Sequence, residues 1–202
     1  MKELYSSSGH HNQAFTANPA QVNTLSLNNM DMNFKKIMIF GRPGSGKSTF
    51  ASSLASISNL PLHHLDKHFY IEKWYKRNYD AFLNIQQNIV NSDFWIIDGN
   101  CTSSFEMRWS KADLVLYFNF PKIICYFRVL KRFLNPNKML DDRAPGCRET
   151  IRFSLLKYMW SFEKRVSPQV ALFKEKYPGA VFREIKSKSD LNKLTQELTA
   201  ST

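Results

Sequence analysis

The feature that most constrains the fold is a glycine-rich segment between an apolar run and a helical pattern. The segment matches Gly-x4-Gly-Lys-Ser and consists of Gly41, Arg42, Pro43, Gly44, Ser45, Gly46, Lys47, Ser48 and Thr49. Before it, Lys36–Phe40 is a short run of strand formers without polar alternation, which is typical of a buried parallel strand. After it, Phe50, Leu54 and Ile57 recur at helical spacing. The sequence therefore predicts a strand, a loop and a helix in succession.

A loop of this kind is expected to bind polyphosphate with its main chain. Its glycines let successive backbone N–H groups turn toward one concavity, and the helix N-terminus adds about half a positive elementary charge. We expect Lys47 to contact the β- and γ-phosphates of ATP and Ser48 to bind Mg²⁺ through its hydroxyl. The other loop residues are expected to complete this nucleotide site. The alternative is an ordinary glycine-rich turn, but the placement between a strand and a helix favours a phosphate loop.

Apolar runs continue to alternate with helical patterns along the rest of the chain. Further strands are predicted at Leu62–Asp66, Phe94–Ile97, Leu114–Phe118 and Val181–Ile185. One helix is indicated by the apolar positions between residues 82 and 90, and another opens at Pro121. The alternation predicts an α/β domain with a mostly parallel sheet, right-handed crossovers and a ligand beyond the carboxyl ends of the strands.

Two aspartates come where predicted strands end. Asp98 follows Phe94–Ile97, and we expect its carboxylate to bind the Mg²⁺ that the phosphate loop recruits; the alternative is a turn or capping aspartate before Gly99. Asp66 ends the predicted strand Leu62–Asp66. We expect it to orient or deprotonate an acceptor hydroxyl or to hold a metal-bound water, with an ordinary loop carboxylate as the alternative.

The cysteines and histidines show no metal-binding spacing. The three cysteines lie more than twenty residues apart, and an odd, sparse count is typical of a reducing compartment. The histidines near Asp66 have no matching acidic cluster, so we expect them to be partly buried or surface side chains; they are His63, His64 and His68.

The charge of the chain is unevenly distributed. The 28 Lys and Arg exceed the 17 Asp and Glu by eleven, but residues 1–33 carry a net charge of −1 and lack apolar periodicity. We therefore expect residues 1–33 to be a disordered polar tail and residues 34–202 to form the folded domain. The stretch 122–165 alone has eleven basic and four acidic residues.

Several of these basic residues are arginines that suit a mobile lid over a phosphate site. Arg128 and Arg132 share a helical face, and two Pro-containing segments bracket a loop that contains Arg143, so a lid is expected at about residues 134–150. Guanidinium groups hold the equatorial oxygens of a transferring phosphoryl group, and closure excludes water. A solvated basic face and a nucleic-acid surface are the alternatives. Three aromatic residues of the following helix are expected in the core rather than as base-stacking platforms; they are Tyr158, Trp160 and Phe162.

Taken together, these motifs resemble those of the adenylate-kinase-like P-loop kinases, and within them the bacterial DNA topology modulation branch, over about residues 35–198. The resemblance rests on the phosphate loop, His64-Leu65-Asp66, Trp95–Asn100, Phe118–Pro121, Arg128–Arg132 and Arg165. It implies a three-layer P-loop NTPase fold similar to nucleoside monophosphate kinases. The implied fold has a five-stranded parallel sheet, a substrate-binding segment after the second strand and a short arginine-rich lid. ATP and Mg²⁺ are the implied cofactors.

The resemblance also carries roles onto individual residues. Lys47, Arg128 and Arg132 are expected to be catalytic, and Asp66 to be a catalytic residue that faces the substrate. The lid loop described above is separately expected to bring Arg143 over the nucleotide. Arg108 follows the Asp-Gly-Asn turn roughly where such kinases place an arginine for a substrate phosphate. Adenylate kinases keep Asp-Gly-x-Pro-Arg, however, whereas Arg108 comes nine residues after Gly99.

Two functions from different classes follow. The first is an ATP-dependent kinase that transfers the γ-phosphoryl group to a nucleoside monophosphate or to a hydroxyl-bearing metabolite. The alternative is a nucleotide-binding regulatory protein that contacts DNA through its basic half, although no DNA-reading motif is evident. The sequence shows no signal peptide or membrane-spanning run, so we expect a cytoplasmic protein that is a monomer or a small homo-oligomer.

Overall fold

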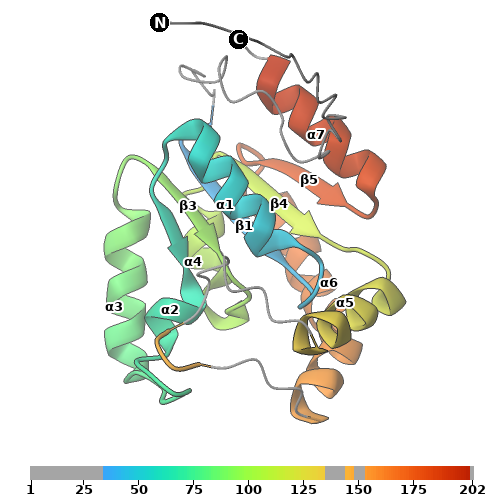
Figure 1. Ribbon diagram of the computed structural model, residues 1–202. Coiled ribbons are helices and arrows are strands. Elements are labelled where there is room, and N and C mark those ends of the chain that lie inside the picture. Colours follow the sequence, from blue (N-terminus) through green and yellow to red (C-terminus); the bar gives the residue numbers. More distant parts are fainter. Residues whose placement is uncertain (1–33, 135–143, 148–152, 201–202) are drawn as a thin grey trace, which may run out of the picture.

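A five-stranded, all-parallel sheet lies at the centre of the molecule (Figure 1). The computed structural model describes residues 34–134, 144–147 and 153–200. Within these residues the strands are arranged in the order β2-β3-β1-β4-β5. They are β1 (Lys36–Gly41), β2 (Leu62–His64), β3 (Trp95–Asp98), β4 (Leu114–Phe118) and β5 (Val181–Ile185). The predicted α/β class and the five-stranded parallel sheet are therefore confirmed.

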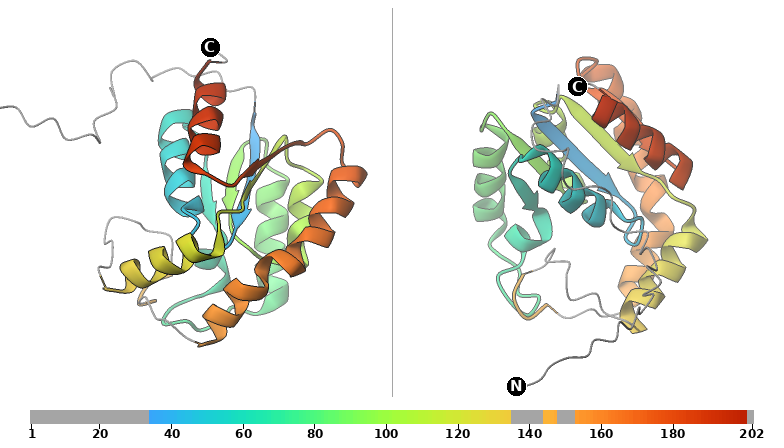
Figure 2. Two further views of the ribbon diagram at one scale, coloured as in Figure 1. Left: turned by 90° about the vertical axis from the view of Figure 1, so that its right-hand side faces the viewer. Right: turned by 45° about the horizontal axis from the view of Figure 1, so that its top comes forward.

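Helices cover both faces of the sheet. They are α1 (Lys47–Ser58), α2 (Leu65–Phe69), α3 (Tyr79–Val90), α4 (Phe105–Trp109), α5 (Lys122–Leu134), α6 (Phe153–Lys176) and α7 (Lys188–Ala200), with one 3₁₀ turn, η1 (Thr102–Ser104). Figure 2 shows α1 and α7 on one side of the sheet and α3, α4 and α6 on the other. None of these described helices combines the length and the apolar character needed to span a membrane.

The position of β1 in the middle of the sheet explains why its sequence lacks polar alternation. Ile37 and Ile39 face a core cluster that includes Leu54 of α1 and Leu194 of α7. Met38 and Phe40 face the opposite cluster, which α3, α4 and α6 complete. Because successive side chains of a strand point to opposite faces, a strand covered on both sides must be apolar at every position.

The register of the parallel strands places chemically active residues side by side. Asp98, the last residue of β3, pairs with Ile39 of β1 on one side and with His64 of β2 on the other. The phosphate loop leaves β1 two residues after Ile39. Its entrance therefore lies next to Asp98 and His64 at the carboxyl ends of the strands, where ligands of open α/β sheets bind.

The second strand is shorter than predicted. β2 pairs with β3 only over Leu62–His64, and α2 begins at Leu65. The expectation that Asp66 ends a strand is wrong, because Asp66 lies in the first turn of α2, where its side chain is exposed. An acidic side chain is favoured in this position by the partial positive charge of the helix N-terminus.

Two amphipathic helices expose some of their large apolar residues. In α5 the buried positions are Cys125 and Val129, whereas Phe127 and Leu130 point outward. In α6 Phe162 is fully buried, but Trp160 is 67% exposed, so its predicted place in the core is wrong. Its indole instead lies beneath the ammonium group of Lys122, 4.9 Å from the ring centroid, a cation–π contact that suits a surface position.

Candidate functional site

The phosphate loop connects β1 directly to α1 and packs closely against α5. Gly46 caps α1 with a positive φ of 93°, and Gly44 has a φ of 81°. A Cβ atom on Gly44 would lie 2.4 Å from the carbonyl oxygen of Cys125 and 2.9 Å from Val129. Gly44 is thus required both for the turn and for the approach of α5. This contact brings the arginines of α5 to the loop.

A small cavity of about 170 Å³ lies at the N-terminus of α1, and we call it the phosphate-loop cavity. It is lined by Gly44, Gly46, Lys47, Ser48, Thr49, Arg128 and Arg132. Nη1 of Arg128 donates a hydrogen bond to the carbonyl oxygen of Ser45 at 3.0 Å, and its guanidinium lies 4.8 Å from the ring centroid of Phe120. Three cations and a helix N-terminus therefore surround one small space, which is the environment that a polyphosphate requires.

The side chain of Arg42 points away from this cavity. It is buried, and its Nε and Nη1 donate to the carbonyl oxygens of Met159 and Phe120 at 3.1 and 2.8 Å. Its Nη2 donates to Oε2 of Glu163 at 3.2 Å. The expectation of a nucleotide contact therefore holds at most for the main chain of Arg42. Its guanidinium instead ties the loop to α6.

Asp98 and His64 form a buried pair beside the loop. Nδ1 of His64 lies 2.9 Å from Oδ2 of Asp98, and their side chains are 7% and 4% exposed. Burial raises the pKa of Asp98, but the charge of Lys47 and the interactions with His64 and Ser48 outweigh it, so the pKa lies below its ordinary value. Asp98 is thus a carboxylate at neutral pH.

The second carboxylate oxygen of Asp98, Oδ1, differs from Oδ2 in its contacts. Oδ1 is buried, and no donor among the described residues hydrogen-bonds to it. A buried carboxylate oxygen normally has a partner. Carboxylate and hydroxyl oxygens are the ligands that Mg²⁺ prefers. Asp98 and the hydroxyl of Ser48 therefore fit Mg²⁺ bound directly or through water.

Two polar contacts that the sequence did not single out support this arrangement. His64 was expected to be a partly buried or surface side chain, but it is buried and its Nδ1 lies 2.9 Å from Oδ2 of Asp98. Oδ1 of Asn100 accepts a hydrogen bond from the backbone N–H of Gly41 at 2.9 Å and so fixes the start of the phosphate loop. The signal was present in the segments His64-Leu65-Asp66 and Trp95–Asn100, but only strand register shows which side chains meet.

Arg108 has a different position from the one that the resemblance implies. Its side chain is fully buried, and its Nε, Nη1 and Nη2 donate to the carbonyl oxygens of Ser104, Gly99 and Cys101. Burial lowers the pKa of Arg108 to about 10, so it remains a cation at neutral pH. All three nitrogens are used within the protein. The expected contact with a substrate phosphate is therefore replaced by support of the turn after β3.

A larger pocket of about 500 Å³ opens beside the phosphate-loop cavity, and we call it the aromatic pocket. Asp66 lines it together with Lys47, Ser48 and Arg132. Its further walls are largely aromatic and apolar; they are Leu65, Phe69, Tyr70, Trp74, Phe82, Cys101, Leu155 and Tyr158, with Pro43, Gly44, Asn100 and Ser154 at the remaining positions. The structure thus brings Asp66, the predicted base, and Lys47, the lysine predicted to bind phosphate, into one space.

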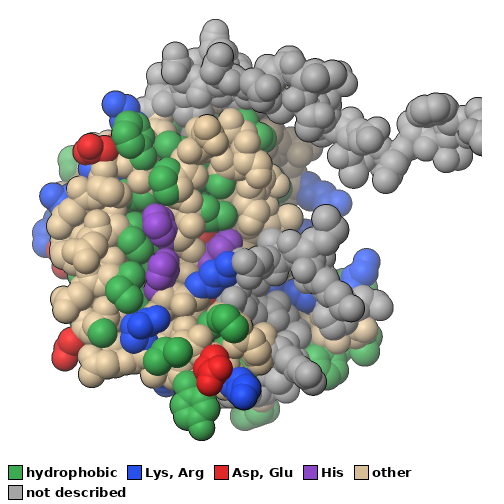
Figure 3. All heavy atoms as spheres, turned by 60° about the vertical axis from the view of Figure 1, so that its left-hand side comes forward, with side chains coloured by type: hydrophobic (Ala, Val, Ile, Leu, Met, Phe, Trp, Pro, Cys, Tyr) green, Lys and Arg blue, Asp and Glu red, His purple; other side chains and the backbone are tan. Residues whose placement is uncertain are grey.

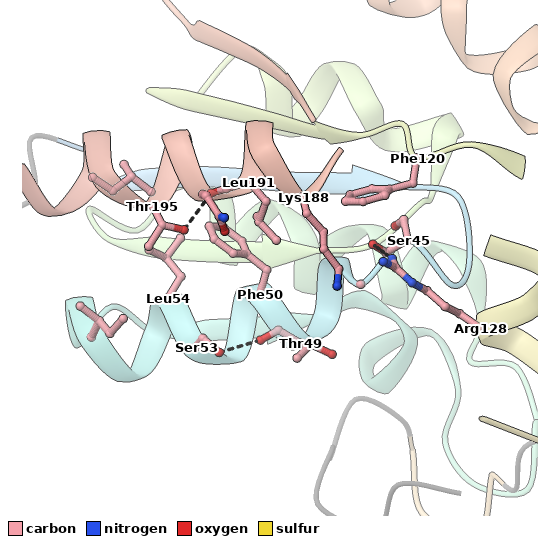
Figure 4. A pocket seen from close by; sticks show the side chains of 14 residues that line it. Ser45, Thr49, Phe50, Ser53, Leu54, Phe120, Arg128, Lys188, Leu191 and Thr195 are labelled. Carbon is pink, nitrogen blue, oxygen red and sulfur yellow. Dashed lines mark hydrogen bonds between the residues drawn. The ribbon is translucent and has the colours of Figure 1, made fainter. Parts of the chain in front are cut away.

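A third hollow of about 520 Å³ runs between α1 and α7, and we call it the α1–α7 groove. Figure 4 shows Ser45, Phe120 and Arg128 at one end, beside the phosphate loop, and Leu54 toward the other. The groove shares Gly46, Thr49 and Arg128 with the phosphate-loop cavity. The helix α7, which the sequence did not predict, forms one of its walls.

The histidines, the predicted lid and the tail are the remaining predicted features of the site. The described histidines lie on one face of the molecule (Figure 3), and the rings of His63 and His68 are 5.7 Å apart. Burial lowers the pKa of both side chains. In the described part of the chain, no group of three or more His, Cys, Asp or Glu side chains is arranged to hold a metal. Arg143, most of the predicted lid and the tail 1–33 lie outside the described residues.

Comparison with known proteins identifies the fold. No protein-family model and no curated protein sequence matches the chain. A shikimate kinase from Acinetobacter baumannii in complex with shikimate matches with a TM-score of 0.53 and 15% identity, over 85% of this chain and 96% of that one. A shikimate kinase from Bacteroides thetaiotaomicron has a TM-score of 0.49 and 17% identity, over 82% and 98%. An uncharacterized protein from Eubacterium ventriosum has a TM-score of 0.45 and 14% identity, over 82% and 99%.

At these identities the similarity shows the fold alone. The chain has the P-loop fold of the Acinetobacter baumannii kinase. The resemblance to P-loop kinases is thereby confirmed at the level of fold. The resemblance to the DNA topology modulation branch stays a prediction.

Proposed function

We propose that this protein is a kinase that transfers the γ-phosphoryl group of ATP to a hydroxyl group of a small acceptor. The observation that carries the proposal is the junction of two cavities. The phosphate-loop cavity and the aromatic pocket share Gly44, Lys47, Ser48 and Arg132. A phosphoryl group held by Lys47 and Arg132 therefore borders the space in which an acceptor is enclosed.

The nucleotide is expected to lie along the residues that the phosphate-loop cavity shares with the α1–α7 groove. Its β- and γ-phosphates occupy the phosphate-loop cavity, where the backbone N–H groups and the three cations neutralise them. The rest of the nucleotide extends toward the mouth of the α1–α7 groove at Arg128 and Phe120. Both ends of ATP thereby contact α5, so that binding orients Arg128 and Arg132.

The chemical step needs a nucleophile, a proton acceptor and charge stabilisation. The acceptor oxygen forms a bond to the γ-phosphorus as the bond to the bridging oxygen breaks, and ADP leaves. The hydroxyl proton passes to Asp66, an exposed carboxylate in the wall of the aromatic pocket. Lys47, Arg128 and Arg132 stabilise the charge on the equatorial oxygens. Mg²⁺, when bound at Ser48 and Asp98, supplies charge neutralisation at the phosphates.

A panel of acceptors tests this function. The full-length protein is incubated with Mg²⁺ and ATP labelled on its γ-phosphate, together with nucleosides, nucleoside monophosphates, shikimate or small polyols. We expect transfer of the label to one class of alcohol. Nucleotide binding without transfer to any acceptor, accompanied by DNA binding at physiological salt, would instead support the regulatory alternative.

A further inference from the structure

The residues that line the aromatic pocket indicate which kind of acceptor it can bind. Five aromatic side chains line it, and they come from α2, the segment after it, α3 and α6; they are Phe69, Tyr70, Trp74, Phe82 and Tyr158. The rings of Phe69 and Phe82 meet edge to face at 5.0 Å, and those of Tyr70 and Trp74 do so at the same distance. Because the rings of Phe69 and Tyr70 also meet edge to face at 4.9 Å, the four aromatic residues from α2, the segment after it and α3 form a connected wall. Such walls stack on flat rings and on the apolar faces of sugars.

The cations that line this pocket among the described residues also line the phosphate-loop cavity. They are the side chains of Lys47 and Arg132. Arg108, at which a second phosphate was expected, is buried and bonded to three carbonyl oxygens. The remaining charged side chain in the lining is the carboxylate of Asp66. Once the triphosphate engages Lys47 and Arg132, the charge that remains in the described lining is that of Asp66, which favours a neutral ring over an anion.

The position of Trp74 is defined by its backbone. Lys73 and Trp74 have positive φ values of 43° and 66°, which side-chain-bearing residues adopt at a cost in free energy. The backbone N–H of Trp74 donates to Sγ of Cys147 at 3.1 Å, and that of Lys73 donates to the carbonyl oxygen of Pro145 at 3.0 Å. Segment 144–147 thus holds the strained turn that presents Trp74 to the pocket.

We infer that the acceptor is an uncharged alcohol with a flat ring, of the nucleoside class, whose ring packs against Trp74 and its aromatic neighbours while its hydroxyl reaches Asp66. This inference rests on the proposed function and narrows it. It excludes acceptors that carry a phosphate or a carboxylate of their own. The volume of about 500 Å³ lies within the range of pockets that enclose small organic ligands.

The test compares acceptors and tryptophan variants. We expect the full-length protein to phosphorylate nucleosides with a kcat/KM at least tenfold higher than for nucleoside monophosphates or shikimate. In Trp74→Leu the KM for the nucleoside should rise about tenfold with little change in kcat, since a base–aromatic contact contributes a factor of this size. Trp74→Tyr should restore most of the affinity. Trp160→Leu, in an exposed position on α6, is the matched control and should behave as the wild type.

Direct binding separates the inference from the proposed function. Calorimetry with a non-hydrolysable ATP analogue and Mg²⁺ shows whether nucleotide binds, and a second titration adds a nucleoside. Failure to bind or phosphorylate any nucleoside, or preference for an anionic acceptor, overturns the inference. The proposed function stands if the label still reaches another alcohol. It fails if wild-type protein binds nucleotide but transfers its label to none.

Discussion

Nδ1 of His64 lies 2.9 Å from Oδ2 of Asp98, and the two residues are register partners on the neighbouring parallel strands β2 and β3. The pair is buried, and the other carboxylate oxygen has no donor among the described residues. His64 therefore fixes the orientation of the carboxylate that we expect to serve Mg²⁺. Groups that orient metal ligands in this way typically change metal affinity by 10- to 100-fold when they are removed.

We predict that His64→Leu weakens the Mg²⁺-dependent component of nucleotide binding by about tenfold or more, because Asp98 loses the group that orients it. His64→Asn, whose amide can still donate to Asp98, should retain most of it. Titration of a fluorescent ATP analogue at several Mg²⁺ concentrations measures the effect. His63→Leu is the control, since adjacent strand residues point to opposite faces. Equal Mg²⁺ dependence in wild type and His64→Leu would contradict a positioning role.

Lys47→Ala should reduce phosphoryl transfer by about a hundredfold or more, because it removes a cation that stabilises charge developing in the transition state. The fold should remain intact, since Lys47 is only partly buried. Steady-state kinetics and circular dichroism measure the two properties. Lys164→Ala, in an exposed position on α6, should have wild-type rates. Full turnover by folded Lys47→Ala protein would refute the proposed function.

Arg108→Lys should lower the free energy of unfolding by about 3 kcal/mol, because lysine cannot bond to three carbonyl oxygens at once and leaves buried acceptors without partners. Urea unfolding monitored by circular dichroism measures the change. The KM for the acceptor should change little in the folded protein. If Arg108→Lys instead had wild-type stability and a raised KM for the acceptor, this result would support the contact between Arg108 and a substrate phosphate that the resemblance implies.

The stability of the protein should fall at alkaline pH through Tyr158. Burial raises the pKa of Tyr158 to about 12, and Arg165 opposes this increase. The protonated hydroxyl is therefore favoured in the folded state. The contribution of this hydroxyl to the free energy of unfolding is complete below about pH 10, the ordinary tyrosine pKa. It is lost as the pH rises toward 12. Urea unfolding between pH 9 and 11 should show a steeper decline for wild type than for Tyr158→Phe, by roughly 1 kcal/mol. Parallel curves would contradict this assignment.

Much of the fold could be predicted from the sequence because its signals are local. The predicted strands Leu114–Phe118 and Val181–Ile185 agree with β4 and β5. The first predicted strand ends one residue before β1 does, and the third is displaced from β3 by one residue at both ends. Apolar runs and the spacing of Gly41–Thr49 depend only on neighbouring residues. The end of the second strand could not be predicted, because it depends on pairing with β3.

Arginine roles were the least predictable part of the site. All four arginines carry the same charge. Arg42 and Arg108 are buried and bonded to carbonyl oxygens, whereas Arg128 and Arg132 line the phosphate-loop cavity. Sequence spacing gives the charge of a side chain but not its direction. The same limit applies to Trp160, since α6 is amphipathic and a shift of one position changes the face.

The sequence by itself determined a glycine-rich phosphate-loop motif between a strand and a helix, because glycine spacing and the adjacent strand and helix are properties of a continuous segment. Only the tertiary structure decided which side chains surround that loop. His64, Asp98 and Asn100 meet it through strand register, and Trp74 enters the aromatic pocket through contacts of its turn with segment 144–147. These contacts join residues that are far apart in the chain, and they depend on packing that no local pattern encodes.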